Sequence, residues 1–234
     1  MSTPVTEKVQ IVYPESDGKP MADNTLQAQY IVYLFDGLRA LFRDDPNVFV
    51  AADLLWYPVE GDPNTCTAPD VMVVFGRPKG HRRSYLQWQE DNIPPQVVFE
   101  IWSPSNTFRD FAEKLTFYER HGVEEFYLYD PERGHLEGWL RKGDKLVPIE
   151  TMDGWVSPRL GIKFTLKGKD LVVYRPDGEP FLPYEELQAR YEELQGRYEE
   201  AQKRLEQERQ RAERERQRAE RLAQRLRELG VEPE

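Results

Sequence analysis

The 234-residue sequence has one cysteine, three histidines and no long hydrophobic run. The single cysteine, Cys66, excludes a disulfide framework and a cysteine-based structural zinc site, in keeping with a reducing compartment. No basic segment followed by an apolar stretch opens the sequence. No apolar run reaches the ~18 residues typical of a membrane-spanning helix. We therefore expect a cytoplasmic protein that is neither exported nor inserted in a membrane.

The sequence also lacks an excess of positive charge, since its formal net charge is −10. From residue 184 onward, 12 Lys and Arg stand against 14 Asp and Glu, a net charge of −2, which leaves −8 on residues 1–183. Strong sequence-independent binding to duplex nucleic acid depends on Lys and Arg that neutralise phosphates. A nucleic-acid function would require metal ions or a local basic rim. The loop KGHRR at 79–83 could supply such a rim or could be a solvated loop.

The composition changes after the segment PDGEPFLP at 176–183. Upstream, apolar stretches alternate with turns that contain glycine and proline. Downstream, turn residues almost disappear, and Glu, Arg and Gln dominate. We therefore divide the chain into a flexible tail at 1–23, a folded domain at 24–175, a linker at 176–183 and a helical region at 184–230.

The helical region carries an unbroken heptad repeat. Its a and d positions are Leu187, Tyr191, Leu194, Tyr198, Ala201, Leu205, Glu208, Ala212, Glu215, Ala219, Leu222, Leu226 and Leu229. Apolar residues at most of these positions over about six heptads predict a coiled coil, ~65–70 Å long at ~1.5 Å per residue. We expect it to form a homodimer, with a seam weakened in its middle by Glu208 and Glu215. The alternative is a solvated single helix held by Glu–Arg pairs three and four residues apart.

The domain at 24–175 alternates helical and strand-like segments. Residues 24–42 show helical periodicity with Asn24 as N-cap and Gln27 reaching back, and 109–122 form a second helix that ends at Gly122. Strand-like runs cover 48–57, 70–75, 96–102, 124–130, 135–141 and 145–149. The order helix, three strands, helix, strands predicts an α/β (α+β) fold in which helices flank a mixed sheet.

A charged residue, Glu100, interrupts the apolar run VVFEIW at 97–102. A buried, unpaired carboxylate is costly, so Glu100 either faces solvent or meets a Lys, an Arg or a metal ion. Asp110 and Lys114 lie four residues apart on one side of the next helix. If that side covers the sheet face that carries Glu100, two carboxylates and an ammonium share one pocket.

Asp70, at the start of the strand DVMVVF, completes a set suited to phosphodiester chemistry. Mg²⁺ takes one or two protein carboxylates and completes its coordination with waters and substrate phosphate oxygens. A lysine beside it can orient the nucleophile or stabilise developing negative charge. Asp70, Glu100, Lys114 and Mg²⁺, or Mn²⁺ in its place, therefore favour phosphodiester hydrolysis. Asp53 also interrupts an apolar strand, and both a minor site role and a hydrogen-bonded turn are consistent with its position.

The succession PDVMVVF, VVFEIWSPSN, a helix with D-x-x-x-K and then Y, and HGVEEFYLYDPE resembles the Uma-type restriction endonuclease family. This family is a branch of the PD-(D/E)xK nuclease superfamily. The resemblance extends from about residue 24 to 175 and does not include the coiled coil. It implies a restriction-endonuclease-like fold and a Mg²⁺-dependent endonuclease that acts on DNA.

The resemblance also implies roles for individual residues. Asp70 and Glu100 match the metal ligands of the family, and Asp110 matches a further acidic position. Trp102 stands where the lysine of the (D/E)xK element is expected, and Lys114 on the following helix takes that lysine's place. This departure leaves an alternative, a catalytically inactive nuclease-fold module whose coiled coil mediates oligomerisation or partner binding.

Overall fold

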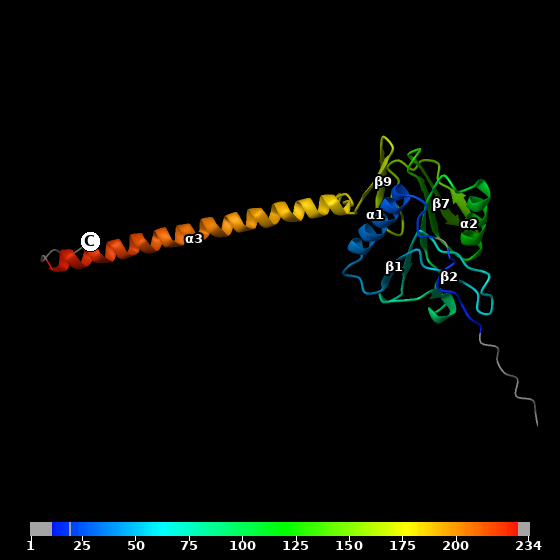
Figure 1. The fold of residues 1–234 in the computed structure, drawn as a ribbon, viewed down its shortest axis with the longest axis horizontal. Helices are drawn as coiled ribbons and strands as arrows, with labels where there is room; N and C mark the ends of the chain where they lie inside the picture. The colour runs from blue at the N-terminus through cyan, green and yellow to red at the C-terminus, as the bar shows by residue number, and fades with distance from the viewer. Residues whose placement is uncertain (1–10, 19, 229–234) are drawn as a thin grey trace, which may run out of the picture. The chain divides into compact units, whose positions relative to one another are not determined.

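The computed structural model describes residues 11–18 and 20–228. The chain divides into two compact units, Met1–Leu182 and Pro183–Glu234. The first unit is built around a mixed sheet with helices, and the second contains one long helix, α3 (Tyr184–Glu228) (Figure 1). The predicted fold class is confirmed. None of the helices in the described part of the chain is both long enough and apolar enough to cross a membrane.

A six-stranded sheet in the order β1–β3–β5–β6–β7–β8 forms the centre of the first unit. Its strands are β1 (Val48–Ala52), β3 (Val71–Phe75), β5 (Val97–Ile101), β6 (Glu125–Asp130), β7 (His135–Lys142) and β8 (Lys145–Pro148). β5 and β6 are parallel, and all the other neighbours are antiparallel. Adjacent parallel strands need a crossover connection, and the helix α2 (Phe108–Arg120) lies in that connection.

Two small sheets accompany the central one. Their strands are β2 (Trp56–Tyr57) and β4 (Tyr85–Leu86), which are parallel, and β9 (Lys163–Lys167) and β10 (Asp170–Tyr174), which form a hairpin. A 3₁₀ helix, Gln87–Gln89, follows β4. The single strand predicted at 48–57 is therefore wrong, because the chain breaks between β1 and β2. Asp53 has a φ of 48° at this break, and a left-handed residue turns the chain out of an extended path.

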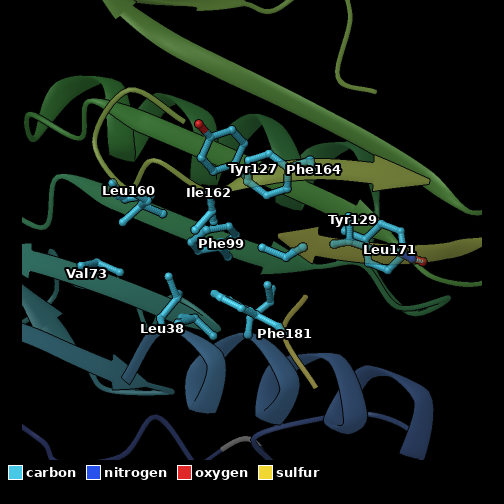
Figure 2. Packing of buried hydrophobic residues seen from close by; sticks show 14 of the residues in the cluster. Leu38, Val73, Phe99, Tyr127, Tyr129, Leu160, Ile162, Phe164, Leu171 and Phe181 are labelled. Carbon is cyan, nitrogen blue, oxygen red and sulfur yellow. Dashed lines mark hydrogen bonds between the residues drawn. The ribbon is translucent and has the colours of Figure 1, made fainter. Parts of the chain in front are cut away.

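The two faces of the central sheet bury different side chains. On one face, Leu38 of the helix α1 (Thr25–Leu41) packs with Phe99 of β5, Phe164 of β9 and Phe181 (Figure 2). On the other face, Tyr118 of α2 packs with Val98 of β5 and its neighbours. Side chains alternate along a strand, so Glu100 lies on the face that α2 covers.

The segment before α1 makes specific contacts where the structure describes it. The ring of Tyr13 lies against Tyr57 and Trp88, with centroid distances of 5.2 and 4.9 Å. The hydroxyl of Tyr13 accepts a hydrogen bond from the backbone N–H of Gly61 at 2.7 Å. Residues 1–10 and 19 of the predicted tail lie outside the described residues.

Candidate active site

Strand pairing brings two of the predicted carboxylates together. β3 and β5 are antiparallel with Val71 opposite Phe99, so one further step of this register places Asp70 opposite Glu100. The backbone N–H of Ile101 donates a hydrogen bond to Asp70 Oδ2 at 2.6 Å. Two acids thirty residues apart in the sequence therefore become direct neighbours, because opposed residues of an antiparallel pair have Cβ atoms ~4.5–5.5 Å apart.

The helix α2 supplies the partners of Glu100. Lys114 Nζ donates to Glu100 Oε2, and the hydroxyl of Tyr118 donates to Glu100 Oε1. Lys114 and Tyr118 lie four residues apart and so project from the same side of α2. Glu100 is only 4% exposed. The charge inside the apolar run is thus buried and paired with a lysine, one of the possibilities that the sequence left open.

These contacts set the protonation states of the group. Burial, with the negative charge of Glu100 beside it, raises the pKa of Asp70 to about 8. Burial by itself would lower the pKa of Lys114, but Glu100 and Asp70 outweigh it and the pKa of Lys114 is raised. Burial and then Glu100 raise the pKa of Tyr118 well above its ordinary value. At neutral pH Lys114 is therefore a cation and Tyr118 a neutral hydrogen-bond donor.

A cleft of about 480 Å³ opens beside this group. Among the residues that the structure describes, six carboxylates line it, including those of Asp53, Asp70 and Asp110, and the one cation in this described lining is Lys114. Glu100 is not part of the lining, and its ion pair with Lys114 connects it to the cleft. The cleft therefore has a strong excess of negative charge, which repels a phosphate and attracts a cation.

The two additional predicted residues, Asp53 and Asp110, both line the cleft but have structural roles as well. The backbone N–H of Asp53 donates to the carbonyls of Pro69 at 3.2 Å and Asp70 at 3.3 Å, so the turn at Asp53 is tied to the site. Burial and then the charge of Asp17 raise the pKa of Asp53. Asp110 Oδ2 accepts from the backbone N–H of Thr107 at 2.7 Å, in a capping box that begins α2.

Gln27 reaches the site in a way that the sequence did not predict. Its side-chain Nε2 donates to the carbonyl of Ile101 at 2.8 Å, and its Oε1 accepts from the backbone N–H of Asp23 at 2.8 Å. The sequence indicated that Gln27 caps α1 and that Gln27 or Gln29 stands where related nucleases carry an acid, but it did not indicate the contact with Ile101. Tyr118 was also missed as a site residue, although its position one helical turn after Lys114 was a usable signal.

A second cluster fastens the chain after β5 to the segment before α1. Ser103 Oγ donates to Asp23 Oδ2 at 2.6 Å, and Ser105 Oγ donates to the same oxygen. The backbone N–H of Ser103 donates to Asn106 Oδ1 at 2.7 Å. The SPSN segment therefore holds the end of β5 in place at one side of the cleft.

Two cations of the basic loop at 79–83 make contacts within the protein itself. Lys79 Nζ donates to the carbonyls of Phe42 and Arg43, each at 2.7 Å. Arg82 Nε forms an ion pair with Glu90 Oε1 at 2.5 Å. These two cations therefore stabilise the fold and have reduced capacity to contact a phosphate backbone.

The oxygen donors at the site fit Mg²⁺ in number and kind. No group of three or more His, Cys, Asp and Glu side chains among the described residues could hold a metal ion. Mg²⁺ nevertheless needs only one or two protein carboxylates, and Asp70 and Glu100 provide two. The raised pKa of Asp70 shows that its negative charge is poorly compensated by the protein. A divalent cation would supply that compensation.

The mixed sheet carries acids at its strand ends, and the helix α2 brings a lysine to them, as the restriction-endonuclease-like arrangement expected from the sequence requires. A comparison with family models matches residues 8–168 to Uma2, described as "Putative restriction endonuclease". The match includes more than half of the chain, so the protein belongs to the Uma2 family, as its sequence motifs indicated. The comparison with curated proteins finds no match.

Among solved structures, the chain is similar to a crystal structure described as a "putative nuclease belonging to DUF820" from Anabaena variabilis ATCC 29413. The two chains are 16% identical, with a TM-score of 0.45. The alignment covers 63% of this chain and 84% of the other.

Proposed function

We propose that this protein is a Mg²⁺-dependent endonuclease that hydrolyses phosphodiester bonds in DNA, acts in the cytoplasm and forms a homodimer through α3. The observation that supports the catalytic part is the convergence of Asp70, Glu100 and Lys114 beside an open cleft. Membership in a family of restriction endonucleases supports the same chemistry.

The two carboxylates would hold the cation, and the groups around them fix the orientation of these carboxylates. Asp70 and Glu100 are the proposed ligands for Mg²⁺, or for Mn²⁺ as a substitute. The bound ion supplies activation of a water molecule and compensation of phosphate charge. Tyr118 and Lys114 fix the orientation of Glu100, and the amide of Gln27 fixes the end of β5 through Ile101.

Lys114 acts through its charge and not as a base. Its pKa is raised by Glu100 and Asp70 despite its burial, so the ammonium keeps its proton at neutral pH. A fixed cation at the wall of the cleft stabilises negative charge that develops on a phosphate oxygen. The excess of carboxylates there makes substrate binding dependent on added cation, since a bare phosphodiester is repelled.

One observation favours the second candidate, an inactive nuclease-fold module that binds partners. Both carboxylate oxygens of Glu100 are already engaged, by Lys114 and Tyr118. A carboxylate has about four lone-pair sites, so these two contacts leave capacity for a metal ion. Direct measurement of metal binding and cleavage separates the two candidates.

The decisive experiment compares cleavage of supercoiled and linear DNA by the wild-type chain and by Glu100→Gln, Asp70→Asn and Lys114→Met in Mg²⁺, Mn²⁺ or EDTA. Each substitution should reduce the Mg²⁺-dependent rate by about a hundredfold or more, as removal of one preorganised electrostatic group does. Glu113→Gln is the matched control, because Glu113 lines the same cleft but pairs with Arg109 at 2.7 Å. Its rate should stay within about threefold of wild type.

Calorimetric titration of the same proteins with Mg²⁺ gives an independent measurement. The wild-type chain should bind Mg²⁺ and Asp70→Asn should not. If Glu100→Gln cleaved DNA at the wild-type rate, Glu100 would not be part of the catalytic site. If the wild-type chain neither bound Mg²⁺ nor cut DNA, the nuclease proposal would be rejected in favour of the inactive interaction module.

A further inference from the structure

The helix α3 presents a long apolar stripe to solvent. Six large apolar side chains at its a and d positions are between 53% and 63% exposed. They are Leu187, Tyr191, Leu194, Tyr198, Leu205 and Leu222. Residue Leu229 of the predicted seam lies outside the described residues. An exposed apolar stripe of this length, interrupted only at Glu208 and Glu215 among its large positions, marks a surface that another protein segment covers.

The charged residues beside the stripe follow the heptad. The g positions are all arginine: Arg190, Arg197, Arg204, Arg211, Arg218 and Arg225. The e positions are Gln188, Gln195, Gln202, Arg209, Arg216 and Ala223. Arginine therefore occupies an e position only in the two heptads whose d position is a glutamate, Glu208 or Glu215. Arginines at these e positions could compensate the glutamates if d and e positions met across a seam.

We propose that α3 pairs in parallel with α3 of a second copy of this chain, and that charged pairs form the centre of the seam. Glu208 would face Arg209 of the partner subunit, and Glu215 would face Arg216 of the partner subunit. In a parallel two-stranded coiled coil the side chain at d packs beside the partner's e residue. The stripe is thus complementary to itself, which identifies the occupant as a second copy.

The antiparallel arrangement is disfavoured by the same residues. Antiparallel helices bring g positions beside g positions, which would set six arginines of one helix against six of the other. When two antiparallel copies of α3 overlap over their full length, Glu208 of one helix lies opposite Leu205 of the partner subunit, and Glu215 lies opposite Tyr198 of the partner subunit. A carboxylate in an apolar layer without a cationic partner is costly to bury. Parallel pairing avoids the carboxylate in an apolar layer. It limits arginine–arginine contacts to Arg204 beside Arg209 of the partner subunit and Arg211 beside Arg216 of the partner subunit, next to Glu208 and Glu215.

Contacts within the single helix are compatible with the parallel pair. Two of the g arginines, Arg190 and Arg204, each form an ion pair with a glutamate four residues earlier, at 2.9 and 2.6 Å, which lowers their repulsion towards a partner. Among the residues that the structure describes, Glu208 and Arg209 form no ion pair or hydrogen bond. Arg216 pairs with Glu213 at 3.2 Å and with Glu220 at 3.5 Å, and Glu215 pairs with Arg211 at 3.3 Å. These side chains are between 48% and 83% exposed, so exchanging such pairs for one across the seam costs little.

Parallel pairing has a consequence for the catalytic units. The chain enters α3 at Tyr184, so both folded units join the coiled coil at the same end. Charged layers in place of leucine layers lower the affinity and select one register. The proposal therefore predicts a specific dimer of moderate strength.

Orientation is tested on the full chain with Cys66→Ser and one spin label at Ala189→Cys, an outward-facing f position. Parallel pairing should place the two labels side by side, within about 30 Å after allowing for linkers. The antiparallel layers pair residue 189 with residue 224, a separation of 35 residues or ~50 Å at ~1.5 Å per residue. Sedimentation equilibrium on the same sample measures the mass. A chain that stays monomeric at 100 times the protein concentration of the distance measurement would overturn the proposal. So would a dimer whose two labels lie ~50 Å apart.

The charged pairs are tested by reversal. Arg209→Glu with Arg216→Glu should weaken the dimer at least tenfold, and adding Glu208→Arg and Glu215→Arg should restore it. The matched control is Arg214→Glu with Arg221→Glu, which changes the net charge equally at outward-facing c positions. This control should leave the dimer dissociation constant within about twofold. Equal weakening by both double variants, or no rescue by the four-residue variant, would refute the pairs across the seam.

Discussion

Asp70 shows how neighbours decide the chemistry of a single residue. Its carboxyl is held by the backbone N–H of Ile101 and lies among buried groups that include Glu100. The pKa of about 8 means that the folded protein without a cation holds a proton there at neutral pH. Burial of an acid beside another acid is tolerated at functional sites because a ligand later supplies the missing positive charge.

The first prediction at this scale concerns stability against pH in the presence of EDTA. The pKa of Asp70 is about 8 in the folded protein and 3.8 in the reference state. The folded chain therefore binds one more proton than the unfolded chain between these values, and the free energy of unfolding falls as pH rises from about 4 to about 8. Asp70→Asn cannot ionise and so does not lose stability in this way as pH rises. The free energy of unfolding of the variant should therefore exceed that of wild type at pH 8.5 by about 2–5 kcal/mol.

Urea unfolding at intervals between pH 4 and pH 9 measures this difference. The difference should become small near pH 4, where Asp70 is protonated in the folded chain and close to half protonated in the unfolded chain. Asp144→Asn, in the turn between β7 and β8, serves as the control and should follow the wild-type curve. If Asp70→Asn is less stable than wild type at pH 8.5, Asp70 is not a destabilising buried acid.

At the scale of elements, two helical glycines in different surroundings make a matched pair. A Cβ added at Gly37 in α1 would overlap the ring of the buried core residue Phe181. A Cβ added at Gly196 in α3 meets nothing within 4 Å. The same substitution therefore meets a steric penalty in one helix and none in the other.

We predict that Gly37→Ala lowers the free energy of unfolding by about 1–3 kcal/mol because of overpacking. Gly196→Ala should instead stabilise its helix by about 1 kcal/mol, the difference in helix propensity between the two residues. Circular dichroism during urea unfolding measures both. Stabilisation by Gly37→Ala would show that Phe181 moves aside without cost.

The same scale shows which elements local pattern could predict. The apolar spacing of α1 and α2 and the alternation around Glu100 were sufficient to place the helices and to predict which side of β5 carries the charge. The break at Asp53 and the β9–β10 hairpin were missed. The hairpin turns at Gly168, which has a φ of 65°, a conformation that glycine adopts at little cost. Short strands of five residues have weak periodicity, so such turns are decided by pairing.

At the scale of the whole molecule, the chain joins an acidic folded unit to an amphipathic helix. The two units are compact separately. The proposed catalytic residues Asp70, Glu100 and Lys114 all belong to the first unit, and the proposed pairing surface belongs to the second. Cleavage chemistry and dimerisation should therefore be separable by shortening the chain.

We predict that a chain ending at Leu182 stays folded and nicks one strand of supercoiled plasmid at a rate within about tenfold of the full chain. Its conversion of plasmid to linear DNA should fall further, because a monomer presents one site to a duplex of two strands. Gel separation of nicked and linear products over time measures the two rates. A folded but inactive shortened chain would show that α3 contributes to the site.

The sequence by itself determined the helices, the heptad, the apolar strands and the family, because these depend on neighbours within one or two turns of chain. Only the tertiary structure decided that Asp70 lies opposite Glu100. It also decided that Lys114 and Tyr118 each donate to one carboxylate oxygen of Glu100. It also decided that Gln27 reaches Ile101 across 74 residues. Contacts of this kind follow from which strands pair and in what register, and that is set by burial of both sheet faces at once.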